Sequence, residues 1–199
     1  MMNLFRMAGD LSHLISILIL IHSIQTKKTA KGISLKTQVL YVIVFVTRYL
    51  DLFTTFVSVY NTLMKIFFIA SSIYAVFLLK KYSSEIKENS DIFPVQYLLI
   101  GATVCALLFH YSFAPTELLW SFSLWLESVA ILPQLFLLEA KGEAELLTIH
   151  YIFALGIYRA LYIPNWFYRY FTEGRLDKLS IVTGVIQTCL LYTSPSPRD

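Results

Sequence analysis

Long apolar runs separated by short polar connections dominate the sequence. Six of them have roughly the ~17–25 residues that an α-helix needs to cross a bilayer. These six runs lie at residues 4–24, 38–57, 62–79, 95–113, 117–138 and 148–170, and a seventh begins near residue 179. The pattern predicts an all-α membrane protein with seven transmembrane helices.

The seventh run is shorter than the others. Leu179 to Leu191 would give only ~20 Å of helix, and two prolines in the following YTSPSPRD rule out a continued helix. We therefore expect a truncated last helix. We also expect residues 1–191 to form a single domain and residues 192–199 to be a non-native tail.

Composition agrees with a membrane protein and argues against several other classes. Hydrophobic residues make up 57% of the chain and charged residues only 15%, against ~25% charged in soluble domains. The net charge of +3 is too small and too scattered for a nucleic-acid interface. The two cysteines suggest neither a disulfide nor a metal site. Phosphate-binding and catalytic motifs are missing, so we expect no cofactor, no metal and no enzymatic activity.

Basic residues in the connections favour one orientation. With a luminal N-terminus, the cytosolic connections hold Lys27, Lys28, Lys31, Lys36, Lys80, Lys81, Lys87 and Lys141. The opposite side then holds Arg6, Lys65, Arg175 and Lys178. Because cytosolic loops of membrane proteins are enriched in lysine and arginine, this difference predicts a luminal N-terminus and a cytosolic C-terminus.

A small set of ionisable side chains falls inside the predicted spans, where each would be costly if it faced lipid. The set is Arg6, His13, Arg48, Asp51, Glu117, Glu127, Arg159 and Arg169. Such groups turn toward a polar cavity or toward one another, so each is a candidate for a functional site. The alternative is a set of internal ion pairs that only fix the helix packing.

The segment YRALYIPNWFYRY, residues 158–170, concentrates polar groups on one helical face. At ~100° per residue, one arc holds Tyr158, Tyr162, Asn165 and Arg169, with Arg159 and Trp166 at its edge. Two arginines, an amide and aromatic rings on an otherwise apolar helix predict a cavity that binds an anion. The alternative for Arg169 is that it extends to the lipid headgroups.

Two further positions leave alternatives open. Arg48 and Asp51 are three residues apart on the second predicted helix, so they either pair with each other or face separate partners. Glu117 lies one turn from Trp120, and either belongs to the site or is a charge favoured by the N-terminus of its helix.

His13 and Glu127 are the candidates for a titrating group. The ordinary pKa of histidine, ~6.5, lies between the pH values of neutral and mildly acidic compartments, which makes His13 the first candidate. Glu127 is the rival. It lies well inside its helix, so its carboxyl must be paired, hydrogen-bonded or protonated.

Several specific motifs occur together. They are MNLFRMAGDLSHL at 2–14, RYLDLF at 48–53, LESVAILPQLF at 126–136, YRALYIPNWFYRY at 158–170 and TGVIQT at 183–188. In this combination the chain resembles the ER lumen protein-retaining receptors, the KDEL receptors, over nearly its whole length. The resemblance implies a SWEET/PQ-loop-like fold, in which two parallel three-helix repeats are joined by helix four. Pro133-Gln134 would be the PQ signature of the second repeat.

The resemblance also implies a function in the membranes of the endoplasmic reticulum and Golgi. Such receptors bind the C-terminal Lys-Asp-Glu-Leu signal of escaped luminal proteins in the acidic Golgi. They return with them in COPI vesicles and release them at neutral pH. The cytosolic tail that recruits the COPI coat would be missing from this chain. The alternative function is a small-solute transporter of the same fold, but four intramembrane arginines favour a receptor, because a tightly held anion leaves slowly.

Residue by residue, the resemblance implies both a signal-binding site and a pH switch. The binding residues would be Arg6, Arg48, Tyr49, Asp51, Glu117, Trp120, Tyr162, Asn165, Trp166 and Arg169. Within this set, Arg48 and Tyr49 would contact the terminal carboxylate of the signal. Asp51 and Glu117 would bind its lysine, with Trp120 in a cation–π contact. Arg6 and Arg169, with Trp166, would bind its two acidic side chains. The pH switch and its supporting network would be His13, Glu127, Tyr158 and Arg159.

Overall fold

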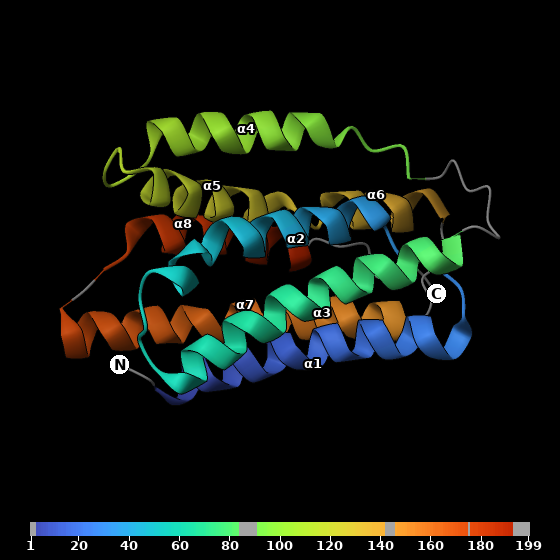
Figure 1. The fold of residues 1–199 in the computed structure, drawn as a ribbon, viewed down its shortest axis with the longest axis horizontal. Coiled ribbons are helices and arrows are strands. Elements are labelled where there is room, and N and C mark those ends of the chain that lie inside the picture. Colours follow the sequence, from blue (N-terminus) through green and yellow to red (C-terminus); the bar gives the residue numbers. More distant parts are fainter. Residues whose placement is uncertain (1–2, 84–90, 142–145, 175, 193–199) are drawn as a thin grey trace.

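The computed structural model describes residues 3–83, 91–141, 146–174 and 176–192, and this part of the chain is almost entirely helical (Figure 1). It contains α1 (Leu4–Lys27), α2 (Leu35–Arg48), the 3₁₀ helix η1 (Leu50–Phe53), α3 (Val59–Ser83), α4 (Val95–Leu108), α5 (Pro115–Val129), α6 (Leu132–Lys141), α7 (Leu146–Glu173) and α8 (Lys178–Tyr192). Each of the seven predicted apolar runs contains helix, and the fifth run is divided between α5 and α6. The predicted non-native tail, residues 192–199, lies outside the described residues except for Tyr192.

Several of these helices have the length and composition of membrane spans. Leu4–Lys27, Val59–Tyr82 and Pro115–Ala140 are long and apolar enough to cross a bilayer, and Val95–Leu108 and Lys178–Tyr192 are shorter apolar helices. Many large hydrophobic side chains on their outer surfaces are exposed, as lipid-facing residues would be. The prediction of an all-α membrane protein is confirmed.

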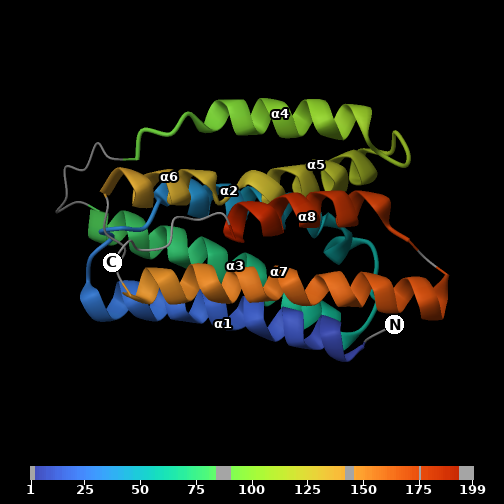
Figure 2. The ribbon, with the colours of Figure 1, turned by 180° about the vertical axis from the view of Figure 1, so that it is seen from behind.

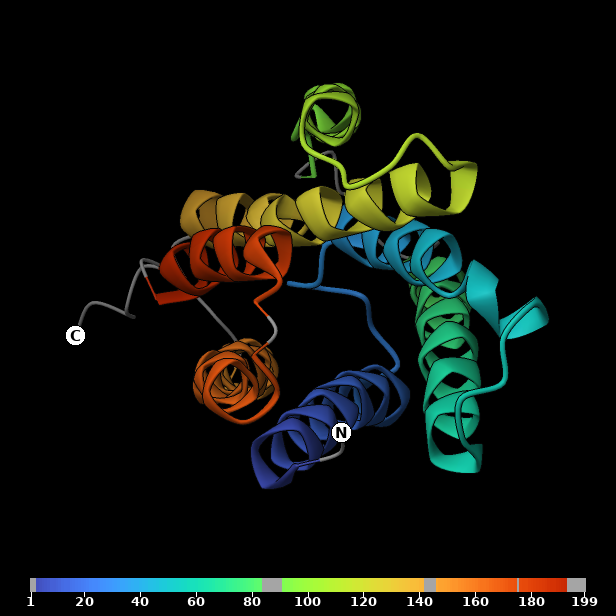
Figure 3. The same cartoon turned by 90° about the vertical axis from the view of Figure 1, so that its left-hand side faces the viewer.

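Six helices form a closed ring, α6 continues beyond the end of α5, and α4 lies outside the ring. Around the ring the helices follow one another in the order α1, α7, α8, α5, α2 and α3, which closes on α1. Each neighbouring pair is in contact. The end-on view in Figure 3 shows this arrangement, with α4 above the ring and packed on α5. The view from behind shows α7 lying along α1 over most of its length (Figure 2). The ring brings side chains from helices distant in sequence toward one centre.

The α1 helix is fixed at the end that carries the candidate site. The Asn3 side chain accepts a hydrogen bond from the Arg6 backbone N–H at 2.8 Å, which caps the first turn. The same side chain donates to the Asn165 Oδ1 at 2.8 Å and so connects α1 to α7. At the other end the helix stops at Lys28, whose φ of 50° is left-handed.

The second predicted span was too long. It was expected at 38–57, but α2 ends at Arg48 and the chain continues through η1. Hydroxyl and carboxylate side chains are frequent here, and they compete for the backbone hydrogen bonds of a helix. Thr54 Oγ1, for example, donates to the backbone oxygen of Asp51 at 3.4 Å. The expectation that Arg48 and Asp51 share a helical face is therefore wrong, because Asp51 lies beyond the end of α2.

Proline shapes two of the other helices. Pro133 cannot donate a backbone hydrogen bond, and its ring crowds the preceding turn, which accounts for the break between α5 and α6 at Ala130 and Ile131. Pro164 lies inside α7, yet that helix runs on to Glu173. The prediction that the 158–170 segment is helical is confirmed, and its polar residues therefore share a face.

Candidate functional site

A polar cavity of about 290 Å³ lies inside the ring, toward the end where α1 begins and α7 ends. All six helices of the ring contribute residues to its walls. Eleven of the predicted site residues line it: Arg6, His13, Arg48, Tyr49, Trp120, Tyr158, Arg159, Tyr162, Asn165, Trp166 and Arg169. The helical face predicted on α7 is thus directed into the cavity. Asp51, Glu117 and Glu127 lie outside its lining.

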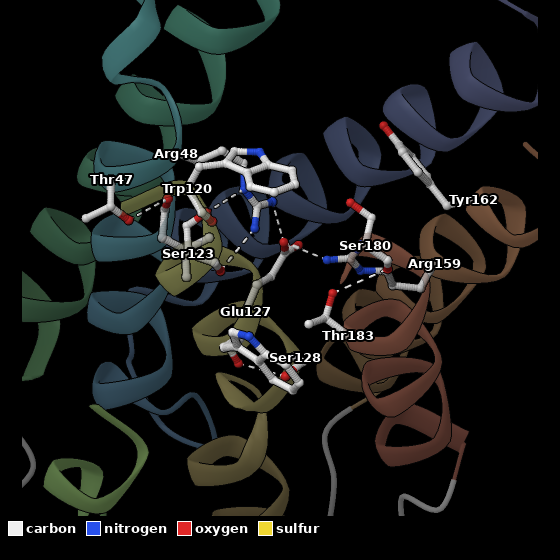
Figure 4. Close-up of polar contacts among 12 residues, drawn as sticks. Thr47, Arg48, Trp120, Ser123, Glu127, Ser128, Arg159, Tyr162, Ser180 and Thr183 are labelled. Carbon is white, nitrogen blue, oxygen red and sulfur yellow. Dashed lines mark hydrogen bonds and ion pairs between the residues drawn. The ribbon is translucent and has the colours of Figure 1, made fainter. Parts of the chain in front are cut away.

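Glu127 forms the most deeply buried ion-pair cluster of the site. Its side chain is 0% exposed, and its Oε2 pairs with both Arg48 Nη1 and Arg159 Nη2, the latter at 2.6 Å (Figure 4). The Tyr158 hydroxyl donates to the other carboxylate oxygen at 3.1 Å. One carboxylate thus joins α2, α5 and α7 and is fully satisfied, as a buried charge must be. The expectation that the Glu127 carboxyl is paired or hydrogen-bonded is confirmed.

Arg48 is held to α5 by more than its charge. Its Nε donates to Ser123 Oγ at 3.1 Å, and its Nη2 donates to the Ser123 backbone oxygen at 3.0 Å. Of the two alternatives for Arg48 and Asp51, the structure therefore supports separate partners. One positive charge remains in excess around Glu127, because two arginines share a single carboxylate.

His13 lies at the base of the cavity between aromatic rings. Its imidazole stacks on Tyr158 of α7 at 4.2 Å between ring centroids and on Phe68 of α3 at 4.7 Å, and only 4% of the residue is exposed. Tyr158 also donates its hydroxyl hydrogen bond to Glu127, so it connects the His13 ring to the Glu127 cluster. His13 and the Glu127 cluster are therefore parts of one network.

Asp51 pairs with a lysine from α3. Lys65 Nζ donates to Asp51 Oδ2 at 2.6 Å, and Lys65 is only 8% exposed. Lys65 lies within α3 and lines the cavity, although it is not among the ionisable residues predicted for the site. Sequence reasoning could have found it, since Lys65 falls inside the third apolar run at 62–79.

Two buried carboxylate oxygens, one on Asp51 and one on Glu117, accept no hydrogen bond from the described residues. These atoms are Asp51 Oδ1 and Glu117 Oε1. Glu117 lies in the first turn of α5, as both interpretations of it required. Trp120 of the same helix lines the cavity. Unpartnered buried acceptors are costly unless a donor arrives, so these atoms are suited to receiving one.

Asp10 is another charged residue of the site that the sequence analysis does not identify. It is not among the predicted intramembrane charges, but it is only 9% exposed and lines the cavity. Its Oδ1 accepts from the Tyr162 hydroxyl at 2.6 Å and its Oδ2 from the Tyr60 hydroxyl at 3.1 Å. Its position in the apolar run 4–24, one turn from His13, was the available signal.

Arg169 lies at the outer part of the cavity. With Trp166 and Asp177 it also lines an adjoining open hollow of about 480 Å³. Its Nε donates to Glu173 Oε2 at 3.1 Å, one turn further along α7. The guanidinium is thus directed to protein groups at the mouth of the site, which favours the cavity over the lipid headgroups as its location.

Cationic side chains outnumber carboxylates in the lining of the cavity. Five cationic side chains line it, Arg6, Arg48, Lys65, Arg159 and Arg169, against the two carboxylates of Asp10 and Asp177. Guanidinium groups bind carboxylates through paired hydrogen bonds. In the described part of the chain, no three His, Cys, Asp or Glu side chains gather as metal ligands would. The site therefore fits a small anionic ligand rich in carboxylates.

Comparison with known proteins gives a consistent result. Residues 29–169 match the family described as ER lumen protein retaining receptor. The chain is 56% identical to the ER lumen protein-retaining receptor of Kluyveromyces lactis, with 97% of this chain and 90% of the relative covered. Its identity to the ER lumen protein-retaining receptor of Saccharomyces cerevisiae is 57%, covering 96% and 91%. Its identity to ER lumen protein-retaining receptor 2 of Gallus gallus is 50%, covering 95% and 90%.

Proposed function

The chain belongs to the ER lumen protein retaining receptor family, and on that premise we propose that it binds C-terminal signals of the Lys-Asp-Glu-Leu type in the polar cavity. The observation that carries this proposal is the presence of five cationic side chains in one cavity between membrane helices. The signal brings three carboxylates, counting its C-terminus, and one ammonium. A receptor for it needs a surplus of cations and a separate place for the lysine.

The assignment of individual residues follows from this complementarity. Arg48 and Tyr49 would contact the terminal carboxylate at the inner part of the cavity. Arg6 and Arg169, with Trp166, Tyr162 and Asn165, would take the acidic side chains nearer its mouth. The lysine would reach the unused oxygens of Asp51 and Glu117 across Trp120, which supplies a cation–π contact. Arg159 would keep its place in the Glu127 cluster.

The membrane arrangement is part of the proposal. Two three-helix repeats, α1–α3 and α5/α6–α8, would be joined by α4, and the position of α4 outside the six-helix ring supports this. The cavity would face the lumen together with the N-terminus, and COPI vesicles would return the receptor with its cargo from the Golgi to the endoplasmic reticulum. The lipid bilayer would be the partner of the exposed apolar surfaces.

The proposed function predicts tight, acid-enhanced binding of a short peptide. Binding of a peptide ending in Lys-Asp-Glu-Leu to the purified protein should be measured at about pH 5.5 and about pH 7.4. A C-terminally amidated peptide serves as the control, because it lacks the terminal carboxylate. Equal binding of the free and amidated peptides would contradict the proposal. Uptake of sugars or amino acids into proteoliposomes would instead favour a small-solute transporter.

Replacing His13 with alanine should abolish the acid enhancement. A protonated imidazole attracts an anionic ligand, and the bound ligand in turn favours the charged form of the imidazole. Protonation and binding therefore favour each other. The carboxylates of the peptide, with ordinary pKa values near ~4, stay ionised in this range. His13→Ala is expected to bind weakly at both pH values, about tenfold below the parent at the acidic one.

The rival sensor and a matched control separate the possibilities. If Glu127 were the sensor, Glu127→Gln would bind strongly at both pH values. His22→Ala is the control, since His22 is exposed on the same helix, beside Thr26. Full acid enhancement in His13→Ala would overturn the assignment to His13.

A further inference from the structure

Each cation that lines the cavity already has a carboxylate from the chain itself. Arg6 lies 4.0 Å from Asp10, Arg48 and Arg159 share Glu127, Lys65 holds Asp51, and Arg169 holds Glu173. An acidic ligand therefore meets no bare arginine in the described part of the site. Wherever it binds, it must either share a cation with an internal carboxylate or displace that carboxylate.

These internal pairs differ in how readily they can exchange. Glu127 is fully buried and bound by three side chains, so the cost of separating it from its partners is high. The Arg6–Asp10 pair is the opposite case. It is the longest of the pairs, and 38% of the Arg6 side chain is exposed. Arg6 can therefore turn to a ligand at little cost.

Asp10 stays in the cavity when Arg6 turns away. The Tyr162 and Tyr60 hydroxyls hold its two oxygens at 2.6 and 3.1 Å. The Tyr162 ring reaches α1 because position 9 is glycine, and a Cβ there would lie only 2.8 Å from the ring. Asp10 thus has partners of its own and keeps a fixed negative charge beside the place where an acidic side chain must bind.

We propose that Asp10 is a built-in competitor of the acidic signal, a specificity-determining carboxylate that shares Arg6 in the empty cavity and repels the signal in the occupied one. The inference rests on the proposed function, in which Arg6 binds an acidic side chain of the signal. Its consequence is that the affinity is held below the value that the cations alone would give. A receptor that must also release its ligand benefits from such a limit.

Neutralising Asp10 should make binding tighter, which few changes inside a binding site do. Asp10→Asn keeps an oxygen that can accept from Tyr162 while it removes the charge. We expect roughly threefold to tenfold tighter binding of the Lys-Asp-Glu-Leu peptide, with a larger gain at low ionic strength. A peptide ending in Lys-Asn-Gln-Leu should gain little, because it lacks the acidic side chains that Asp10 repels.

Charge-retaining and second neutral variants complete the test. Asp10→Glu should give no gain, since the negative charge remains. Asp10→Ser is a smaller neutral variant, which replaces Asp10→Asn if that protein does not fold and should also bind more tightly. If the parent binds the acidic peptide and neither neutral variant binds it more tightly, the competitor role is wrong and the proposed function stands. If the parent does not bind the peptide at all, both fail together. An equal gain for both peptides would likewise overturn the competitor role.

Discussion

Replacing Glu127 with glutamine is expected to lower the free energy of unfolding by about 3–5 kcal/mol, because it leaves buried arginine charges without their counter-ion. Glu127 is 0% exposed and pairs with Arg48 and Arg159. A neutral amide of the same size can still accept a hydrogen bond but cannot balance either guanidinium. The change should appear as a large decrease in the thermal unfolding temperature of the purified protein in detergent.

Two comparisons make this prediction specific. Glu139→Gln is the matched control, since Glu139 is exposed on α6, and it should unfold within a degree or two of the parent. The double variant Glu127→Gln with Arg159→Gln should be more stable than the sum of the single changes predicts. The second change removes the Arg159 charge, which Glu127→Gln leaves without a counter-ion. A Glu127→Gln protein as stable as the control would show that the cluster does not stabilise the fold.

Much of the fold was accessible from the sequence because membrane helices are encoded by composition over long windows. The seven apolar runs all contain helix, and the 158–170 segment is helical through Pro164. What composition cannot specify is where a helix stops. Near the end of α2, tertiary contacts add to the local side-chain hydrogen bonds, namely those of Arg48 with Ser123 and of Asp51 with Lys65. These partners are distant in sequence.

The candidate site was predicted well where its residues share one helix and less well where partners come from different helices. The spacing on α7 correctly directs its polar residues into one cavity. Neither Asp10 nor Lys65 was assigned to the site, although both lie in apolar runs. Lys65 of α3 pairs with Asp51 of η1, a partner outside its own helix. Pairing between helices is a property of the fold, and no spacing in the sequence reveals it.

Arg169→Lys should weaken binding of the Lys-Asp-Glu-Leu peptide by about 2–3 kcal/mol, or roughly thirtyfold to a hundredfold, although the charge is kept. The geometry of the Arg169–Glu173 pair explains why. The hydrogen bond to Glu173 uses Nε of Arg169, so its two Nη groups can make a bidentate contact with a ligand carboxylate at the mouth of the cavity. A lysine ammonium has neither the planar fork nor the reach to hold Glu173 and a ligand at once.

The measurement is peptide affinity at about pH 5.5, where the receptor should bind most strongly. Lys80→Arg is the matched control, since it exchanges the same two residue types at an exposed position at the other end of the ring, and its affinity should equal that of the parent. Arg169→Lys should also retain the thermal stability of the parent, because the pair with Glu173 is partly exposed and such pairs contribute little, about 0–1 kcal/mol. A loss of affinity without a loss of stability would place Arg169 in direct contact with the signal. An unchanged affinity would remove Arg169 from the binding site and leave Arg6 and Arg48 as the remaining candidates for the acidic groups.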